Sequence, residues 1–470
     1  MTHVASPRST SSPALPTTPP GPSTRWWGLP LLREMRRDYL AFEDRLHRAH
    51  GDISFMQLGP ERAWNLMHPD LAREALVTHA QHLVRWERGV EVFEQAFGQS
   101  VLVTEGDTWQ RQRRMLMPAF TPKKVAEYSE FMSDAGKNCF VSLIPAGQSR
   151  ATIHMDALWS RVAMDVILRV LFGQVASNDS TEAAEATQTL SATAYQEMFH
   201  PLTLPDWLPL PGKAAKRRAM QVLRQLVQRH IDAHRHSAAT ITATGATDTL
   251  LGMLLSLQDP ETGQPLSAQE VFDQCMVSFQ AGHETSATAL LWWSHLMANH
   301  PHAAQHAQAE VDAVLRGSNP TAEHLPQLPW LTATLKETLR LYPPISALMT
   351  RRTTAPIQLG EWAIPKGHLL RITPWVIHRD KRWFTQPDQF RPERFLEGAP
   401  SIPRGAWLPF GTGPRVCIGQ HFTLLEMTLL AAMLLQRYRL TRPQGAPEPK
   451  PVMHVTLRPE QPIVLVLERR

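Results

Sequence analysis

Cysteine is scarce in this chain, which has only three among its 470 residues: Cys139, Cys275 and Cys417. So few cysteines, in an odd number, exclude a disulfide framework and indicate a reducing compartment. Cys139 and Cys275 are interpreted as small apolar side chains of the core. Cys417 lies in a glycine-rich stretch and is therefore judged by its neighbours.

Long hydrophobic runs are also absent. The longest, Thr428–Leu435, has eight residues, whereas a membrane-spanning helix needs about 18 or more. Residues 1–25 are rich in Ser, Thr and Pro and lack a basic patch followed by an apolar segment, so they do not resemble a signal peptide. We predict a flexible arm over residues 1–25, no transmembrane anchor and a soluble, cytoplasmic protein.

A concentrated excess of one charge is lacking as well. The net charge is +5, but the basic residues are dispersed and form no stripe interleaved with aromatic residues. This pattern argues against a nucleic-acid partner and still permits an acidic protein partner.

What the chain does have is mostly helical periodicity, so we predict one domain over residues 26–470 that is mainly α with a small β subdomain (α+β). β-branched or apolar–polar alternation between Gly and Pro turns predicts short strands near 53–68, 345–375 and 452–468. Helical patterns dominate from about Thr108 to Leu341.

Two helix boundaries can be read directly from the sequence. Ser267 and Glu270 have the spacing of a capping box, which predicts the start of a long helix that ends near Asn299. A final helix is predicted from about Cys417 to Arg437.

The stretch FGTGPRVCIG, Phe410 to Gly419, surrounds Cys417 with three glycines, a proline and an arginine. A zinc site would need further Cys or His residues at ligand spacing, and none are nearby. A catalytic thiol needs a base that the sequence does not identify. Backbone N–H groups at the start of the following helix, together with Arg415, would favour a thiolate. Such a loop suits one anionic sulfur that ligates a metal whose other ligands are not protein, as in heme.

Five positions of this stretch, Phe410, Gly413, Arg415, Cys417 and Gly419, form F-x-x-G-x-R-x-C-x-G. This pattern resembles the heme-ligand loop of the cytochrome P-450 family, in its soluble bacterial type, and the resemblance extends from about Trp26 to the end. It implies that family's fold, with a long central helix over the heme, and Cys417 as the iron ligand.

A second motif is KETLR, which places Glu337 and Arg340 on one helix face. By itself this spacing is typical of an ordinary surface pair. The downstream FRPERF resembles the family's partner segment, so Arg394 is expected to complete a buried Glu-Arg-Arg network that supports the cysteine loop.

A third motif, AGHETS at residues 281–286, interrupts an otherwise apolar helix. It resembles the family's oxygen-activation segment. The resemblance implies that Gly282 lets dioxygen approach the backbone, that Thr285 supplies a hydroxyl, and that Glu284 relays protons. Ala281 stands where covalently heme-linked relatives carry a glutamate, so the heme is expected to be non-covalent.

A fourth motif, WQRQRR, places Trp109 and Arg113 one helical turn apart. In the family such a pair binds a heme propionate. Arg351 resembles another propionate contact, with Arg352 as the alternative register.

The resemblance implies a monooxygenase that inserts one oxygen atom from O2 into a hydrophobic organic substrate, with hydroxylation as the expected reaction. It implies heme b as cofactor, and NAD(P)H acting indirectly through a reductase with a ferredoxin or flavodoxin. A monomer is expected. Two alternatives remain: a heme-thiolate peroxygenase, against which the Glu284–Thr285 pair argues, and a non-catalytic heme-binding sensor.

The segments that carry specificity in the family are mostly apolar here, which favours a lipid, a terpenoid or another hydrophobic molecule. The predicted pocket residues are Val90, Phe93, Phe97, Phe199, Leu202, Phe279, Ile345, Leu348 and Met453. Basic residues expected to form a patch for an acidic redox partner are Arg111, Arg114, Lys123, Lys124 and Arg404. Arg113 and Arg415 are left out of that patch because they are expected to face the propionates.

Overall fold

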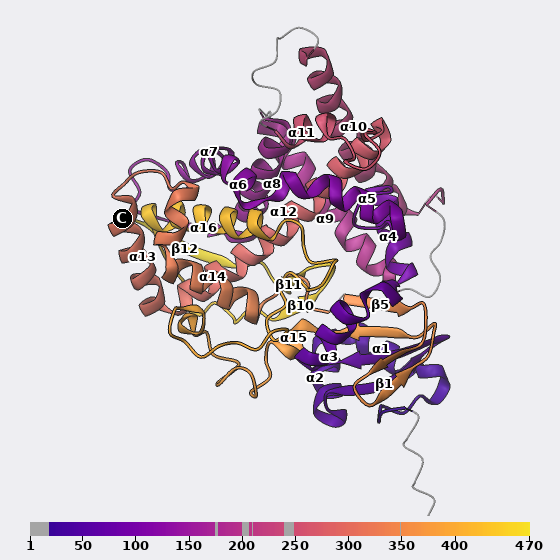
Figure 1. The fold of residues 1–470 in the computed structure, drawn as a ribbon. Helices are drawn as coiled ribbons and strands as arrows, with labels where there is room; N and C mark the ends of the chain where they lie inside the picture. Colours follow the sequence, from indigo (N-terminus) through magenta and orange to yellow (C-terminus); the bar gives the residue numbers. More distant parts are fainter. Residues whose placement is uncertain (1–17, 174–176, 200–205, 209, 239–248, 348) are drawn as a thin grey trace, which may run out of the picture.

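The computed structural model describes residues 18–173, 177–199, 206–208, 210–238, 249–347 and 349–470. Helices make up most of the chain, and the large sheet that contains β1 and β5 lies at the lower right of Figure 1 with α1–α3. The fold class predicted from the sequence, mainly α with a small β part, is confirmed.

The helices of eight residues or more are α1 (Leu29–Arg37), α2 (Tyr39–His50), α4 (Glu87–Phe97), α5 (Gly106–Leu116), α7 (Ser129–Phe140), α8 (Met155–Phe172), α9 (Ser177–Phe199), α10 (Pro211–Ala238), α12 (Ala268–Asn299), α13 (Pro301–Leu315), α14 (Pro329–Leu341) and α16 (Gln420–Arg437). Shorter helical segments are η1 (Arg25–Gly28), α3 (Pro69–Arg73), η2 (Glu74–Thr78), η3 (Ala80–His82), η4 (Met117–Phe120), α6 (Pro122–Glu127), α11 (Leu250–Ser256), η5 (Ala322–Gln327), α15 (Pro374–Ile377) and η6 (Pro392–Phe395).

The strands form one five-stranded sheet and three smaller ones. The large sheet has the order β1 (Ile53–Leu58), β2 (Glu61–Leu66), β8 (Leu369–Ile372), β5 (Met349–Thr353) and β3 (Leu83–Arg85), and only the β2–β8 pair is parallel. A three-stranded sheet joins β4 (Arg150–His154), β12 (Val464–Arg469) and β9 (Tyr438–Thr441). The hairpins are β6 (Ile357–Leu359) with β7 (Trp362–Ile364), and β10 (Pro451–Met453) with β11 (Leu457–Pro459).

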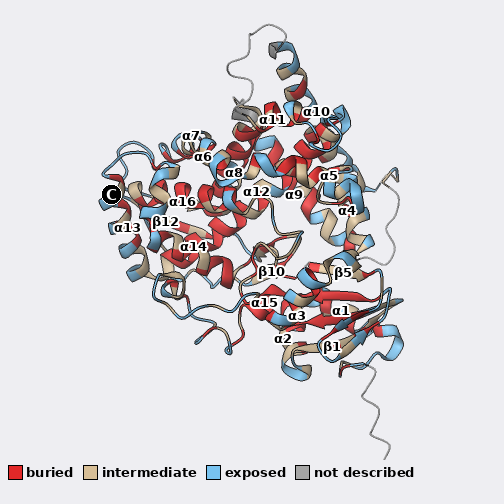
Figure 2. Ribbon diagram, viewed as in Figure 1, coloured by how far each residue is buried: buried red, intermediate tan, exposed pale blue. Residues whose placement is uncertain are grey.

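The long helix α12 is the centre of the helical part. It begins after Ser267, whose hydroxyl accepts from the N–H of Glu270 while the Glu270 carboxylate accepts from the N–H of Ser267. The predicted capping box and the end at Asn299 are both confirmed. Figure 2 shows buried residues concentrated along α8, α12 and α16, and the indoles of Trp292 and Trp293 are fully buried there.

Two local expectations need correction. The flexible arm was predicted to reach residue 25, but the N–H of Phe55 in β1 donates to the carbonyl of Pro20 at 3.2 Å, so the ordered packing begins earlier. Strand β4 was missed inside the region read as helical, because its five residues alternate between partly buried and exposed at a sheet edge. Among the described residues, no helix is both long and apolar enough to cross a bilayer.

The α3–η2 segment supports the loop Phe410–Gly419 and the residues just before it. Gly413 has φ +77°, and a Cβ there would overlap the carbonyl oxygen of Leu76 in η2. Gly405 has φ +90°, and its Cβ would lie 2.7 Å from the carbonyl oxygen of Pro69 in α3. The loop therefore packs backbone against backbone on the α3–η2 segment, which only glycine allows at these positions.

We predict that Gly413→Ala lowers the free energy of unfolding by about 2 kcal/mol more than Gly411→Ala. Gly411 is a matched control because it lies in the same loop with φ +72°, yet its nearest neighbour would be the Met349 methyl at 3.7 Å. Both variants carry the cost of a left-handed alanine, and only Gly413→Ala adds an overlap with backbone. Chemical denaturation of both variants measures the difference; equal losses would contradict the packing argument.

Candidate active site

Cys417 lies where the loop turns into α16. Its N–H donates to the carbonyl of Phe410 at 2.9 Å, and the N–H of Val416 donates to the carbonyl of Gly413 at 3.0 Å. Gly419 is the N-cap of α16, which begins at Gln420. The residue as a whole keeps accessible surface.

The predicted thiolate is not the favoured form of Cys417 in the protein alone. Surrounding protein atoms withhold the solvation that a thiolate needs, and this raises the pKa of the Cys417 thiol. The N–H of Gly419 and the charge of Arg113 act in the opposite direction, but more weakly. A metal ion would have to displace the thiol proton on binding.

Next to the cysteine loop, Arg85, Arg351 and Arg415 gather around the carboxylate of Glu105. Arg415 forms an ion pair with Glu105, donates to the carbonyl of Thr104 at 3.0 Å, and lies 3.9 Å over the Trp109 ring. The N–H of Arg85 donates to the same Glu105 at 3.0 Å. A shared cavity of about 440 Å³ is lined by Arg85, Glu105, Trp109, Arg351 and Arg415.

The arginine cluster is defined here as Arg85, Arg113, Arg351 and Arg415. Nearby negative charge is too small to balance its buried cations. Burial, and then the neighbouring arginines, lower the pKa of Arg415 to about 10 and the pKa of Arg85 well below its usual value. Burial also lowers the pKa values of Arg113 and Arg351. The buried Nε of Arg85 has no hydrogen-bond partner among the described residues. Cations so placed are suited to an anionic ligand, such as the carboxylates of heme.

The structure distinguishes between the two candidate registers at residues 351 and 352. The Arg352 guanidinium pairs with Glu61 at 2.8 Å and with Glu87 at 2.7 Å. Arg351 instead donates to the carbonyl of Thr350 at 2.9 Å and lowers the pKa of Arg415 through its charge. Arg351 therefore belongs to the arginine cluster and Arg352 does not.

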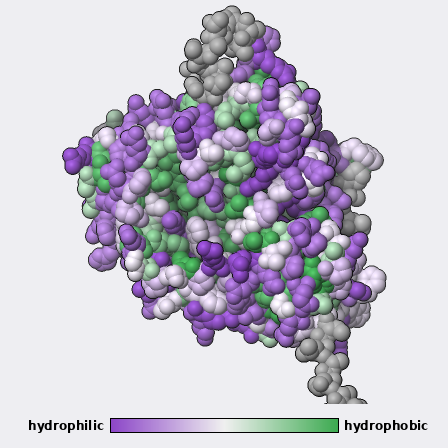
Figure 3. Space-filling model, viewed as in Figure 1, coloured by the Kyte–Doolittle hydropathy of each residue, from purple (hydrophilic) through white to green (hydrophobic). Residues whose placement is uncertain are grey.

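Helix α12 presents one accessible face in the middle of its buried length. Ser278, Ala281, Gly282 and Thr285 keep accessible surface while the residues between them are buried. Their spacing of i, i+3, i+4 and i+7 puts them on one side of the helix. The Thr285 hydroxyl donates to the carbonyl of Ala281 at 2.8 Å. Figure 3 shows hydrophobic side chains in a hollow at the middle of the molecular face, with a largely hydrophilic rim.

Gly282 has a packing role besides the one predicted. A Cβ at this position would lie 3.0 Å from Cδ1 of Ile167. The missing side chain thus lets α8 pack closely against α12, while the predicted approach of dioxygen stays a prediction.

Glu284 points away from that accessible face. Its Oε1 accepts from Ser191 Oγ at 2.8 Å, from Thr456 Oγ1 at 2.6 Å and from Arg458 Nη2 at 2.8 Å. Glu284 and His283 line a cavity of about 990 Å³ bounded by α8, α9, α12 and β11. Burial lowers the pKa of His283 to about 4, so that ring is neutral at pH 7.

Glu337, Arg340 and Arg394 meet as the sequence motifs suggested. Arg340 holds Glu337 with two hydrogen bonds, from Nε at 2.7 Å and from Nη2 at 2.8 Å, and both residues are fully buried. Arg394 Nε donates to Glu337 Oε1 at 3.2 Å, and the N–H of Arg391 donates to the same oxygen at 2.9 Å. This network joins α14 to η6.

The predicted substrate residues separate into three groups. Val90 and Phe93 line a cavity of about 60 Å³ beside Arg351, the Phe97 ring stacks on the Phe93 ring at 5.5 Å, and Ile345 is half-buried. Leu202, Leu348 and the Phe199 side chain lie outside the described residues. The remaining two residues lie in packed surroundings. Phe279 is fully buried in the main core, and Met453 packs with Leu31, Met35 and Tyr39 of the N-terminal helices.

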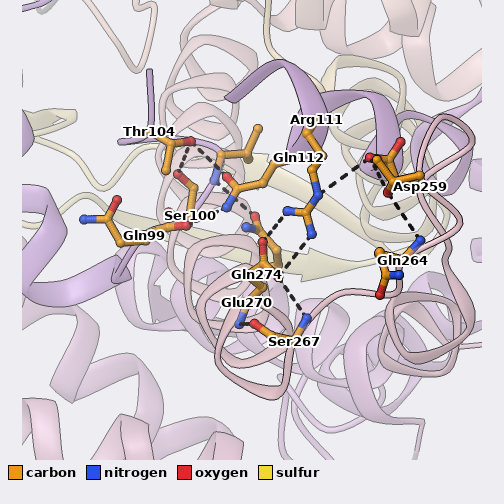
Figure 4. A network of polar contacts seen from close by, with 12 residues as sticks. Gln99, Ser100, Thr104, Arg111, Gln112, Asp259, Gln264, Ser267, Glu270 and Gln274 are labelled. Carbon is orange, nitrogen blue, oxygen red and sulfur yellow. Dashed lines mark hydrogen bonds and ion pairs between the residues drawn. The ribbon is translucent and has the colours of Figure 1, made fainter. Parts of the chain in front are cut away.

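The predicted basic patch also needs correction. Figure 4 shows Arg111 turned toward Glu270 and Asp259. Its Nη1 lies 2.5 Å from Glu270 Oε1, and its Nε lies 3.7 Å from Asp259 Oδ2. Arg114 pairs with Asp259 at 3.1 Å and with Glu261 at 2.8 Å. These pairs tie α5 to the start of α12, so their charges are largely neutralised. Lys124 pairs with Glu127, while Lys123 and Arg404 are exposed.

Sequence reasoning missed Arg85, Glu105, Ser191, Arg458 and Glu426. Ser286 Oγ donates to the buried Glu426 at 2.5 Å, and burial raises the pKa of Glu426 to about 8, so a protonated acid links α12 to α16. None of these residues lies in a motif with recognisable spacing. Their roles follow from contacts between elements far apart in the chain.

Comparisons with known proteins agree with the geometry. A family model described as Cytochrome P450 matches residues 19–467. Cyclooctat-9-en-7-ol 5-monooxygenase of Streptomyces melanosporofaciens is 35% identical over 398 residues, covering 83% of this chain and 83% of that protein. Cyclooctatin synthase of the same organism is 35% identical over 457 residues, covering 93% and 96%. Echinocystic acid 23-monooxygenase of Saponaria officinalis is 29% identical over 453 residues, covering 91% and 84%.

We predict that Arg351→Met weakens heme retention about tenfold, because one charge-assisted hydrogen bond to a carboxylate contributes roughly 1.5–3 kcal/mol. Arg352→Met is the matched control, since it removes the neighbouring arginine from a pair with Glu61 and Glu87. Heme transfer to an apo-globin acceptor measures the retention. Faster heme loss in Arg352→Met than in Arg351→Met would reverse the assignment of the two registers.

Proposed function

Because the chain belongs to the cytochrome P450 family and is a heme-dependent monooxygenase, we propose that it hydroxylates an apolar, largely hydrocarbon molecule that already carries a hydroxyl group. The observation that carries this proposal is the likeness to cyclooctat-9-en-7-ol 5-monooxygenase over 83% of both chains. The half-buried Val90, Phe93 and Ile345 and the small residues of the α12 face suit such a substrate. Terpenoid alcohols are the first class to test.

The protein uses heme b, with O2 as co-substrate and NAD(P)H acting through a reductase. We propose that Cys417 ligates the iron and that the arginine cluster holds the heme carboxylates, with the Trp109 ring supporting Arg415. Bound heme supplies the iron at which dioxygen is activated, with electron donation from the cysteinate. The buried, unpaired Nε of Arg85 and the excess of cations around Glu105 support this placement.

Thr285 and Glu284 are proposed to divide the control of protons between them. Thr285 lies on the accessible face of α12, where its hydroxyl could turn from the Ala281 carbonyl and hold a proton on the cofactor side of the helix. Glu284 lies about 100° further around the helix, where it lines the cavity that also contains His283 and Arg458. A proton that travels from this cavity to the accessible face would have to pass α12. Glu284 and Thr285 are consecutive residues, so the acid and the hydroxyl lie where the proton would pass.

The electron donor is proposed to be a ferredoxin or flavodoxin with its reductase, and the enzyme is proposed to act as a monomer. Exposed Lys123 and Arg404 remain available to an acidic partner, whereas Arg111 and Arg114 are already paired within the chain. Electrostatic steering therefore depends on fewer charges than the sequence alone suggested.

The substrate proposal is tested by titrating the ferric protein with terpenoid alcohols, with their deoxygenated hydrocarbons and with fatty acids of similar size. We expect the alcohols to give the spectral change that follows loss of the iron-bound water and to yield products one oxygen atom heavier with NADPH, reductase and ferredoxin. Preference for fatty acids would overturn the substrate class. Full turnover with peroxide alone would overturn the proposed route of electrons.

We predict that Thr285→Ala reduces the product formed per NADPH consumed by about tenfold and raises hydrogen peroxide correspondingly, because the proton-positioning hydroxyl is lost. Ser278→Ala is the matched control, since it removes a hydroxyl from the same accessible face two helical turns earlier. NADPH, peroxide and product are counted in the same reaction. An unchanged ratio in Thr285→Ala would remove this hydroxyl from the mechanism.

A further inference from the structure

The N-terminal edge of the molecule carries three strongly exposed large apolar side chains close together in sequence. Trp26 is 80% exposed, Trp27 is 73% exposed and Leu29 is 60% exposed. They lie in η1 and at the start of α1, beside β1 at the lower right of Figure 1. Two neighbouring indoles in water forgo a large hydrophobic gain, which is unusual unless something covers them.

The backbone holds these two indoles outward under strain. Trp26 and Trp27 both adopt left-handed conformations, with φ 56° in each case, and such conformations are unfavourable for residues with a Cβ. The segment is nevertheless fixed, because the carbonyl of Trp27 accepts from the N–H of Gly59 at 2.7 Å in the β1–β2 turn. Gly28 is buried and follows with φ +73°, and a Cβ there would overlap the carbonyl of Gln57.

Positive charge surrounds the indoles. Arg25, Arg33, Arg36 and Arg37 are all exposed on η1 and α1. The acidic residue of this segment, Glu34, is bound by Arg45 of α2 with hydrogen bonds of 2.6 and 2.5 Å. The exposed surface of residues 25–37, called the Trp–Arg edge here, therefore combines amphipathic rings with an excess of cations.

We propose that the Trp–Arg edge docks the enzyme on the surface of an anionic phospholipid bilayer. Indoles favour the headgroup level of a bilayer, where one side of the ring is apolar and the N–H remains hydrated. Arginines beside them attract anionic lipid, each with an energy that depends on salt. A peripheral contact of this kind needs no spanning helix.

The charge pattern argues against two alternative occupants of this edge, a second copy of the chain and an acidic protein. A second copy of the chain would bring four arginines against four arginines, which repel each other. An acidic protein would match the arginines but would gain less from two rings whose polar N–H groups need partial hydration. A lipid interface satisfies both features at once.

The test is cosedimentation of the full-length holoprotein with vesicles of phosphatidylcholine alone or of phosphatidylcholine with 30% phosphatidylglycerol. We expect binding to the anionic vesicles that weakens as salt rises, and about tenfold weaker binding of the double variant Trp26→Ser/Trp27→Ser. Replacing Arg33, Arg36 and Arg37 with Gln should remove the preference for anionic vesicles. Val141→Ser is the matched control, because Val141 is 61% exposed at the far end of α7.

Three outcomes would overturn the proposal: no binding to either kind of vesicle, equal binding to both kinds, or equal binding of the wild-type chain and the double tryptophan variant. A wild-type dimer without lipid that the double variant cannot form would assign the edge to a second copy instead. Heme content and thermal unfolding of every variant show that a loss of binding does not come from misfolding.

Discussion

The fully buried ion pair between Glu337 and Arg340 is the interaction on which the cysteine loop depends. Arg340 also donates to the carbonyl of His378 at 2.7 Å, and the His378 ring donates from Nδ1 to the Arg340 carbonyl at 3.0 Å. The other ring nitrogen, Nε2, accepts from the N–H of Leu408 at 2.7 Å, two residues before Phe410. An unbroken chain of hydrogen bonds therefore runs from α14 to the entrance of the loop.

This chain of bonds works only while the histidine is neutral. A protonated ring would present a donor to the N–H of Leu408 and would add a charge beside the Arg340 guanidinium. Burial lowers the pKa of His378 to about 3, which keeps the acceptor available over the physiological range. The carboxylate of Glu337 must likewise keep its partner Arg340. Removing one partner from a buried pair leaves the other charge without solvent, at a cost of roughly 3–5 kcal/mol.

Sequence patterns predicted the features whose cause is local. The capping box at Ser267, the i,i+3 pair Glu337–Arg340 and the glycine-rich loop around Cys417 each depend on residues close together in the chain. Features that depend on contacts between distant elements were missed. The contact that a Cβ at position 282 would make with Ile167 of α8 is one example, and the full burial of Phe279 in the main core is another.

The stretch Arg111–Arg114 shows how helical phase assigns different tasks to neighbouring residues of one type. Arg111 and Arg114, three positions apart, lie on one side of α5 and pair with acidic residues around Asp259 and the start of α12. Arg113 points to another side, where its charge lowers the pKa values of Arg85 and Arg415.

The paired arginines fix α5 against α12, and this attachment sets the position from which Arg113 and Trp109 reach the cofactor side. The arginine cluster is costly for the protein alone, since burial and mutual repulsion depress its pKa values despite the nearby Glu105. The surrounding ion pairs hold the cluster in place despite that repulsion. An anionic ligand that relieves the repulsion should therefore stabilise the same elements that form its site.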